Sequence, residues 1–290
     1  MKTTTLEDKI ILVTGATGKQ GGATARHLVA AGVKVRALTR KPDSKAAEAL
    51  KELGIEVVKG NLNYFASVNE VMKNVYGVFS IQNGWEFGTD EAKQNKNIAD
   101  AAKQHHVGHL VFASIARCDD NPNLKHFVSK YKSEQYLKET GIPFTSLRAV
   151  YFMDNLKPNA QGVGMSWEML RKNLGSKTTL QMIACEDIGW FAANAFLHPQ
   201  EWIGKTIDIA GDSVSYPEAI AAYQKIFGTP PIHSKLFAAM VRLLVSDVRK
   251  MFEWYREPCF HADIDHLRKI HPGLLKLEEY FRLINSRQRK

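Results

Sequence analysis

Three glycines near the amino terminus have the spacing of a phosphate-binding turn. The segment VTGATGKQGG places an apolar strand directly before the first of them, and an apolar helix follows at once. Glycines allow a tight turn and a close approach of the backbone to a pyrophosphate, whose charge the helix dipole stabilises. A plain strand-to-helix turn is the alternative, but the strand, the spacing and the helix together favour a dinucleotide site. The predicted phosphate site comprises Gly15, Thr17, Gly18, Lys19, Gln20 and Gly21.

The residues after the second predicted strand bear on which dinucleotide is bound. An NAD-preferring site carries Asp or Glu there, to hold both ribose hydroxyls. Here Thr39 is followed by Arg40 and Lys41. A guanidinium and an ammonium suit a 2′-phosphate, although two basic residues are also compatible with a solvated loop. We therefore predict that the cofactor is NADP(H) and that Arg40 and Lys41 contact it.

The elements that position these residues follow from the alternation of short β-branched runs with amphipathic stretches. Strands are predicted over residues 9–14, 34–39, 56–59, 77–81, 109–114 and 144–149. Helices are predicted over residues 21–31, 44–53, 66–72, 89–106 and 129–140. This is the pattern of repeated βαβ units. The predicted fold class is α/β, with a doubly wound parallel Rossmann sheet.

After Tyr151 the alternation weakens. A segment over residues 157–164 contains Gly, Pro and Asn, and a strand over 178–183, a helix over 187–197 and a strand over 205–210 follow. Helices without intervening strands are predicted over 216–227, 234–254 and 263–283. We expect an NAD(P)-binding domain over residues 1–155 and a smaller, mainly helical substrate or partner lobe over 156–290. Residues 178–211 are expected to return in part to the main sheet.

Composition limits the class of protein. Of 290 residues, 44% are hydrophobic and 24% are charged, as in ordinary globular proteins. The three cysteines lie far apart, without the spacing of a zinc site or a disulfide scaffold, which favours a reducing, cytoplasmic compartment and no bound metal. We find no secretory signal and no apolar run that could span a membrane.

The net charge of +9 and the basic segment over residues 286–290 raise the possibility of nucleic-acid binding. Lysines and arginines are spread among acidic neighbours, and no recognition motif accompanies them. A solvated basic surface is the simpler interpretation, and we predict no direct contact with nucleic acid.

The chain resembles the NmrA-like branch of the atypical short-chain dehydrogenases, which includes quinone reductases and NADPH-sensor proteins. The resemblance spans most of the chain in matching order. It is carried by VTGATGKQGG, the turn Gly60-Asn61-Leu62, HFVSKYKSEQYL, SLRAVYFMDNL and ACEDIGWFAANAF.

The resemblance implies further cofactor contacts. Asn61 and Leu62 would border the adenine, although the family often has Asp at the first of these positions. Lys93 matches a basic position of the sensor-like members, and a solvated helix charge is the alternative. The other implied cofactor contacts are Gln82, Asn83, Tyr151, Phe152 and Asn155.

The resemblance also implies catalytic positions. The wider superfamily sets a Tyr four residues before a Lys, and this chain has His126 and Lys130 there. A spacing of four places both side chains on one helical face if the helix begins early enough. His126 is a candidate proton donor or an exposed residue at a helix entrance, whereas Lys130 is expected to hold the ribose in either case. Ser114 occupies the position of the substrate-polarising hydroxyl, or is an ordinary strand-end serine.

Three functions follow as expectations. The first is an NADPH-dependent oxidoreductase acting on a quinone or similar small electrophile, in which the cofactor supplies the electron chemistry. The second is a non-catalytic NADPH/NADP sensor that regulates a protein partner, which the missing tyrosine favours. The third is an isoflavone-reductase-like enzyme. The chain is expected to be a monomer or a homodimer.

Overall fold

The computed structural model describes residue 6 and residues 8–82, 90–121, 123–158, 162–175 and 177–288. The chain forms two compact units. Unit 1 comprises Met1–Cys118, His126–Arg148 and Ile188–Ile207, and unit 2 comprises Asp119–Lys125, Ala149–Asp187 and Asp208–Lys290. The chain thus leaves unit 1 and returns to it twice, at His126 and at Ile188.

A seven-stranded sheet in the order β3-β2-β1-β4-β5-β6-β9 is the framework of unit 1. Its strands are β1 Ile10–Thr14, β2 Lys34–Thr39, β3 Glu56–Lys59, β4 Val75–Ser80, β5 His109–Ile115, β6 Phe144–Ala149 and β9 Thr206–Ile209. The pairs β1–β2, β1–β4, β2–β3 and β4–β5 run parallel. Because the strand order reverses at β1, the sheet is doubly wound, with its switch point between β1 and β4.

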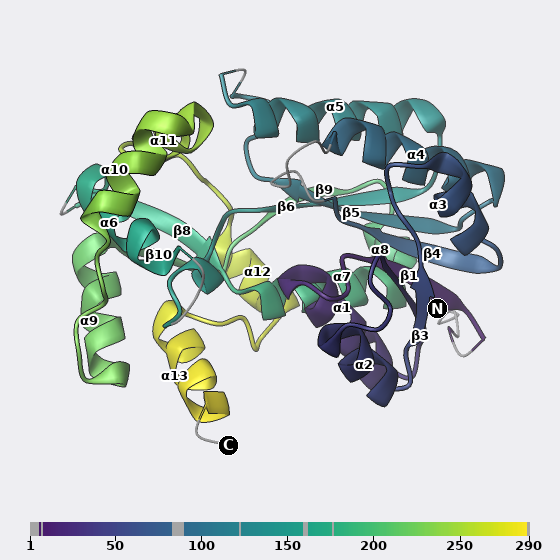
Figure 1. Cartoon of the computed structure of the whole chain (residues 1–290), viewed down its shortest axis with the longest axis horizontal. Coiled ribbons are helices and arrows are strands. Elements are labelled where there is room, and N and C mark those ends of the chain that lie inside the picture. Colours follow the sequence, from purple (N-terminus) through teal and green to yellow (C-terminus); the bar gives the residue numbers. More distant parts are fainter. Residues whose placement is uncertain are drawn as a thin grey trace. The chain divides into compact units, whose positions relative to one another are not determined.

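Helices cover both faces of this sheet. They are α1 Lys19–Ala30, α2 Lys45–Glu52, α3 Phe65–Val71, α4 Glu91–Gln104, α5 Lys125–Thr140, α7 Cys185–Leu197 and α8 Pro199–Trp202. Figure 1 shows α3, α4 and α5 on one side of the sheet and α1, α2 and α7 on the other. The predicted α/β fold class is therefore confirmed.

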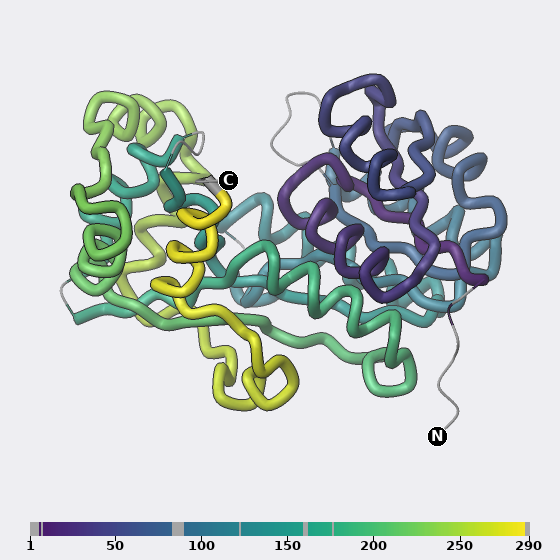
Figure 2. Tube along the Cα trace, turned by 90° about the horizontal axis from the view of Figure 1, so that it is seen from below, coloured from purple at the N-terminus to yellow at the C-terminus, as the bar shows by residue number. Residues whose placement is uncertain are grey.

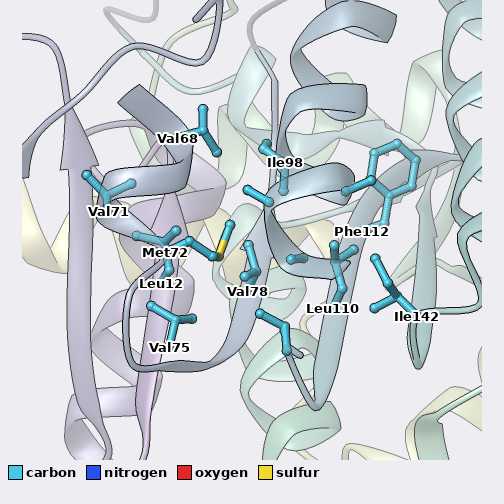
Figure 3. Close-up of a cluster of buried hydrophobic side chains, with 14 of the residues drawn as sticks. Leu12, Val68, Val71, Met72, Val75, Val78, Ile98, Leu110, Phe112 and Ile142 are labelled. Atoms are coloured by element: carbon cyan, nitrogen blue, oxygen red, sulfur yellow. The ribbon is translucent and has the colours of Figure 1, made fainter. Parts of the chain in front are cut away.

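The core beneath α3 and α4 is aliphatic. Leu12, Val78 and Leu110 point from three adjacent strands toward Met72 and Ile98, and all five side chains are buried (Figure 3). Burial of a side chain of this size stabilises the folded state by about 1.5–3 kcal/mol. This packing fixes the strand order that brings the ends of β1 and β4 together.

On the opposite face, two glycines let α7 and the sheet approach closely. A Cβ atom at Gly189 would lie 2.6 Å from the Cβ of Ala23 in α1, and one at Gly77 of β4 would lie 2.8 Å from the Phe196 ring. Figure 2 shows α7 lying beside the purple α1. Because glycine has no Cβ at these two positions, α7 can pack close to α1 and to the sheet.

Unit 2 combines a three-stranded sheet with helices. The sheet has the order β10-β8-β7, with β7 Tyr151–Phe152, β8 Thr179–Ile183 and β10 Asp212–Ser215, and a short 3-10 helix covers Met153–Asn155. The helices are α6 Val163–Asn173, α9 Tyr216–Phe227, α10 Lys235–Leu244, α11 Ser246–Trp254, α12 Ile264–Ile270 and α13 Leu277–Gln288. Among the residues that the structure describes, no helix is long and apolar enough to cross a membrane.

The elements of unit 2 differ in several places from the predicted ones. The single helix predicted over 234–254 is divided at Val245, whose backbone is not helical. The one predicted over 263–283 is divided into α12, which ends before His271 and Pro272, and α13. A residue before proline is driven out of the helical region by the proline ring. The strands β7 and β10 and the helix α6 were not predicted.

A buried histidine joins β5 to the neighbouring strand in unit 1. His109 Nε2 lies 2.8 Å from Thr145 Oγ1, whose hydroxyl donates to the Trp202 carbonyl oxygen at 2.7 Å. The threonine proton is therefore already used, and Nε2–H must be the donor to Thr145. Within the described part of the chain the buried His109 Nδ1 has no hydrogen-bond partner, and burial lowers the pKa of this imidazole to about 4. The folded protein holds His109 neutral.

We predict that stability falls as the pH is lowered because of this histidine. In the unfolded chain the imidazole gains a proton below its ordinary pKa of about 6.5, whereas in the folded chain it gains one only below about pH 4. Between these two pH values the unfolded state therefore binds more protons than the folded state, and stability falls as the pH falls. Between about pH 7 and about pH 5 the loss attributable to His109 is about 2 kcal/mol. Urea denaturation of wild type and His109→Gln at both pH values measures it. An identical pH dependence in the two proteins would contradict the prediction.

Candidate functional site

The glycine turn lies at the carboxyl end of β1. Gly15 has a φ of 61°, in the left-handed region that favours glycine, and Gly18 caps α1 while its N–H donates to the Gly15 carbonyl oxygen at 2.9 Å. The first helical turn contains Lys19 and Gln20 rather than acidic residues. Gly15, Thr17, Gly18 and Lys19 are exposed, although β1 itself is buried. The turn thus presents an accessible backbone and the positive end of a helix dipole.

The glycines of the turn have different roles. A Cβ at Gly21 would lie 2.4 Å from the Gly15 carbonyl oxygen and 2.7 Å from the Thr14 carbonyl oxygen, so this position requires glycine for the packing of α1 on β1. A Cβ at Gly18 would lie 3.2 Å from the Gly15 oxygen, which is tight but adjustable. Gly21 therefore serves the fold, whereas Gly18 belongs to the exposed rim of the turn.

A threonine hydroxyl ties the ends of β1 and β4. Thr14 Oγ1 accepts from the Ile81 N–H at 2.8 Å and donates to the Ile81 carbonyl oxygen at 2.8 Å. Both groups lie at the switch point of the sheet, where ligands of doubly wound folds bind. The clamp holds the residue after Ile81, which is Gln82, beside the glycine turn.

Gln82 connects this strand end to Lys130 on α5. The amide Nε2 donates to Ser80 Oγ at 2.7 Å, and Oε1 accepts from Lys130 Nζ at 3.1 Å. Lys130 Nζ also lies 3.0 Å from a Glu91 carboxylate oxygen and 5.1 Å from the centre of the Phe112 ring. The Lys130 side chain is buried, so its charge is held by a carboxylate, an amide and an aromatic face.

The position of Lys130 depends on a buried ion pair one turn further along α5. Glu134 accepts two hydrogen bonds from Arg148, at 3.0 and 2.6 Å, and one from Ser146 Oγ at 2.6 Å. Arg148 and Ser146 belong to β6, and Glu134 is fully buried. A bidentate pair fixes direction as well as distance. The inward face of α5 is therefore set by this polar contact with the sheet.

Arg40 and Lys41 lie just beyond β2, and both are exposed. The Lys41 N–H donates to Thr39 Oγ1 at 3.2 Å, and the Lys41 carbonyl oxygen accepts from Ser44 Oγ at 2.9 Å. Ser44 in turn caps α2. These contacts shape the loop that follows β2, at the same edge of the sheet as the glycine turn.

Asn61 and Leu62 follow β3 at this edge. Gly60 donates to the Thr39 carbonyl oxygen at 2.9 Å, which places the end of β3 beside the end of β2. Asn61 Oδ1 accepts from the Asn63 N–H at 3.0 Å, and the Leu62 carbonyl oxygen accepts from the Asn97 side chain at 2.8 Å. The predicted adenine contacts thus form an ordered turn, and their role remains a prediction.

The two other catalytic candidates lie on α5 and β5. The helix begins at Lys125, four residues earlier than predicted, so His126 and Lys130 are both helical and share a face. The His126 ring is half-buried and meets Phe127 edge to face at 4.8 Å. Ser114 is buried, with its hydroxyl 3.8 Å from Cys118 Sγ. Whether either takes part in catalysis remains a prediction.

The remaining predicted contacts are Lys93, Asn83 and three residues after β6. Lys93 is exposed on α4 and lines a depression of about 410 Å³ together with Lys96, Lys132 and Tyr136. Asn83 lies outside the described residues. Tyr151, Phe152 and Asn155 belong to unit 2. The Tyr151 ring is buried against Tyr255 at 5.8 Å, and burial raises the pKa of its phenol to about 12.

Several residues of structural or functional interest were not singled out from the sequence. Glu91 carries the carboxylate beside Lys130, and Thr14 and Glu134 hold the strand and helix that meet there. In unit 2, Asp154 accepts from the Cys185 N–H at 2.9 Å and so caps α7. Asp154 lies within SLRAVYFMDNL, and Glu91 follows a capping Asp at a helix start, but neither pattern indicates a partner.

Comparison with known proteins places the chain in a family. Residues 7–281 match the model of the NmrA-like family. An NmrA-like family domain-containing oxidoreductase, FrzB of a Cladobotryum species, is 29% identical over 247 residues, which cover 76% of this chain and 74% of that protein.

Solved structures have the same fold. NmrA, a negative transcriptional regulator, in complex with NADP has a TM-score of 0.79 at 21% identity and covers 97% of this chain and 96% of that one. The NADPH-dependent quinone oxidoreductase QOR2 of Escherichia coli, complexed with NADPH, has a TM-score of 0.75 at 21% identity, with 95% and 99% coverage. With a family match over nearly its whole length, the chain belongs to the NmrA-like family.

Proposed function

We propose that this protein binds NADP(H) at the carboxyl edge of its seven-stranded sheet and is an NADPH-dependent oxidoreductase acting on a quinone or a similar small electrophile. The observation that carries the proposal is the meeting of the glycine turn, Gln82 and the buried ammonium of Lys130 at the switch point between β1 and β4. A pyridine dinucleotide requires a turn that binds its phosphates and, beside it, a cation that can donate to a ribose hydroxyl.

The residues at this edge suit each part of NADP(H). The exposed backbone from Gly15 to Gly18, with Lys19, would hold the pyrophosphate, and Arg40 with Lys41 would hold the 2′-phosphate. Lys130 would hold a ribose hydroxyl with its third N–H, since Gln82 and Glu91 accept from the ammonium at two positions and a lysine ammonium has three donors. Two relatives in fold, the NmrA regulator and QOR2, were solved with NADP and NADPH, which supports this choice of cofactor.

The chemistry divides between the cofactor and this chain. A bound reduced nicotinamide supplies the hydride. His126, on the same helical face as Lys130, would deliver a proton to the reduced oxygen of the acceptor, since histidine is the side chain that most often acts as a general acid. Ser114 would donate a hydrogen bond to the same oxygen from the end of β5. The quinone class is suggested by the activity in the name of QOR2.

A second function is favoured by a specific observation. His126 stands where the wider superfamily has its catalytic tyrosine, and a neighbour of high structural similarity is described as a negative transcriptional regulator. In that case the same edge would bind NADP(H) and report its redox state to a protein partner, without turnover.

The first test concerns the choice between NADPH and NADH. Arg40→Ala is expected to weaken NADPH binding by about tenfold to a hundredfold, because one charge-assisted contact to the 2′-phosphate is worth about 1.5–3 kcal/mol. NADH binding should change little. Titration calorimetry with both cofactors measures the two constants, and Lys45→Ala, an exposed lysine at the start of α2, is the matched control. A preference for NADPH that survives Arg40→Ala would refute this role for Arg40.

The second test concerns Lys130 and its carboxylate partner. Lys130→Met is expected to lose NADPH affinity by at least about tenfold, whereas Lys132→Ala, an exposed lysine on the same helix, should not. Glu91→Gln is expected to bind NADPH roughly a few-fold more tightly, because it keeps an acceptor while removing a charge that competes for Lys130 and repels phosphates. Weaker NADPH binding by Glu91→Gln would mean that the carboxylate holds Lys130 ready for the cofactor.

The third test separates enzyme from sensor. Wild type with NADPH and a panel of quinones should show loss of nicotinamide absorbance. His126→Phe should keep NADPH affinity and lose turnover by about two to four orders of magnitude, the usual worth of a positioned acid. NADPH binding without turnover on any quinone would favour the sensor function. Equal turnover in both proteins would leave an enzyme with another proton donor.

A further inference from the structure

A cluster of exposed apolar side chains lies on and beside α10. Of twelve large hydrophobic residues that are exposed in the described part of the chain, seven fall between residues 232 and 245. Leu236, Leu243 and Leu244 are 86%, 81% and 76% exposed. The others in this cluster are Ile232, Phe237, Met240 and Val245. Single exposed leucines are ordinary, but a contiguous group of this kind marks an interaction surface.

The cluster forms one face of the helix. Residues 236, 237, 240, 243 and 244 follow the spacing of a helical stripe. Ala238, on another face of α10, is buried, and the helix packs on α6 and α11. At its start, the Ser234 N–H donates to the Gly164 carbonyl oxygen at 2.9 Å. The buried side of this helix thus carries a small residue, and its largest apolar side chains point outward. In a helix that packs into a core, the large apolar side chains point inward.

The charges on and near this helix indicate the kind of partner. The sequence of α10, KLFAAMVRLL, contains Lys235 and Arg242 and no acidic residue. In α11, Arg249 and exposed Lys250 balance Asp247 and Glu253, so the two helices together carry a positive charge. Arg242 is in a loose ion pair with Glu253 at 3.5 Å. The whole chain carries a net charge of +9. A second copy of the chain would bring like charge to this face, whereas an anionic lipid surface brings the opposite charge together with an apolar interior.

We propose that α10 docks this protein on an anionic membrane surface, with its leucine face at the boundary between headgroups and acyl chains. A helix of 10 residues is about 15 Å long, half the thickness of a bilayer core, so it would lie in the plane of the surface. Lys235 and Arg242 lie away from the leucine face, and their long side chains reach up to the phosphates while their stems cover apolar surface. The docking requires neither the cofactor nor catalysis.

The experiment is sedimentation of the full-length protein with two kinds of vesicle, phosphatidylcholine alone and phosphatidylcholine mixed with phosphatidylserine. Wild type should sediment with the mixed vesicles, and less so as salt is raised, because screening weakens the charge contribution. Leu243→Gln combined with Leu244→Gln should reduce vesicle affinity by about tenfold for each leucine. Lys235→Glu should weaken binding to the mixed vesicles only.

Leu53→Gln is the matched control, since Leu53 is a half-exposed leucine at the end of α2, and it should bind vesicles like wild type. Circular dichroism of each variant checks that it is folded. Wild type that stays in the supernatant with both vesicles would overturn the proposal. So would a wild-type dimer in sedimentation velocity that the two glutamine substitutions convert to monomer, since the leucine face would then belong to a second copy of the chain.

Discussion

The architecture of the cofactor edge depends on how closely α1 approaches the end of β1. At Gly21 there is space only for a hydrogen atom, because a Cβ would lie 2.4 Å from the Gly15 carbonyl oxygen. This contact draws the helix N-terminus onto the strand end and leaves the turn between them exposed. The Thr14 hydroxyl then binds both backbone groups of Ile81, so that the end of β4 is held at the same place. An exposed turn at the start of α1, beside the end of β4, thus follows from one steric constraint and one hydroxyl.

The other side of the edge is held by polar packing as well as by the buried Phe127 and Leu137 of α5. The face of α5 toward the sheet carries Lys130, Ser133 and Glu134, all buried. A buried ion pair such as Glu134–Arg148 adds little net stability, because desolvation offsets most of its attraction, but losing one partner costs about 3–5 kcal/mol. Its contribution here is directional, because the bidentate geometry fixes the rotation of α5 about its axis. That rotation points Lys130 toward Gln82 instead of toward solvent.

The sequence predicted the doubly wound sheet because each βαβ unit has its own local pattern of β-branched and amphipathic segments. Unit 2 was predicted less well, since β10 is only four residues long and its partner β8 lies about thirty residues earlier in the chain. The glycine turn and Lys130 were identified from spacing alone or by resemblance. Glu91 could not be, because its ion pair with Lys130 joins two helices far apart in sequence. Long-range polar contacts of this kind depend on tertiary packing and leave no local signal.

In the proposed function, binding and chemistry would rest on separate groups, so the same cofactor site would be compatible with an enzyme and with a sensor. The groups proposed to bind the cofactor, such as the glycine turn and the buried Lys130, already have a fixed backbone geometry or a fixed charge. The hydroxyl of Ser114 differs, because its partner in the structure is the thiol of Cys118 at 3.8 Å, a weak contact. Replacing this weak contact by a hydrogen bond to a carbonyl or quinone oxygen would cost little free energy, so the hydroxyl can bind an acceptor. In the proposed enzyme this hydroxyl would turn from the Cys118 thiol to the acceptor oxygen, whereas in a sensor it would keep its contact with the thiol.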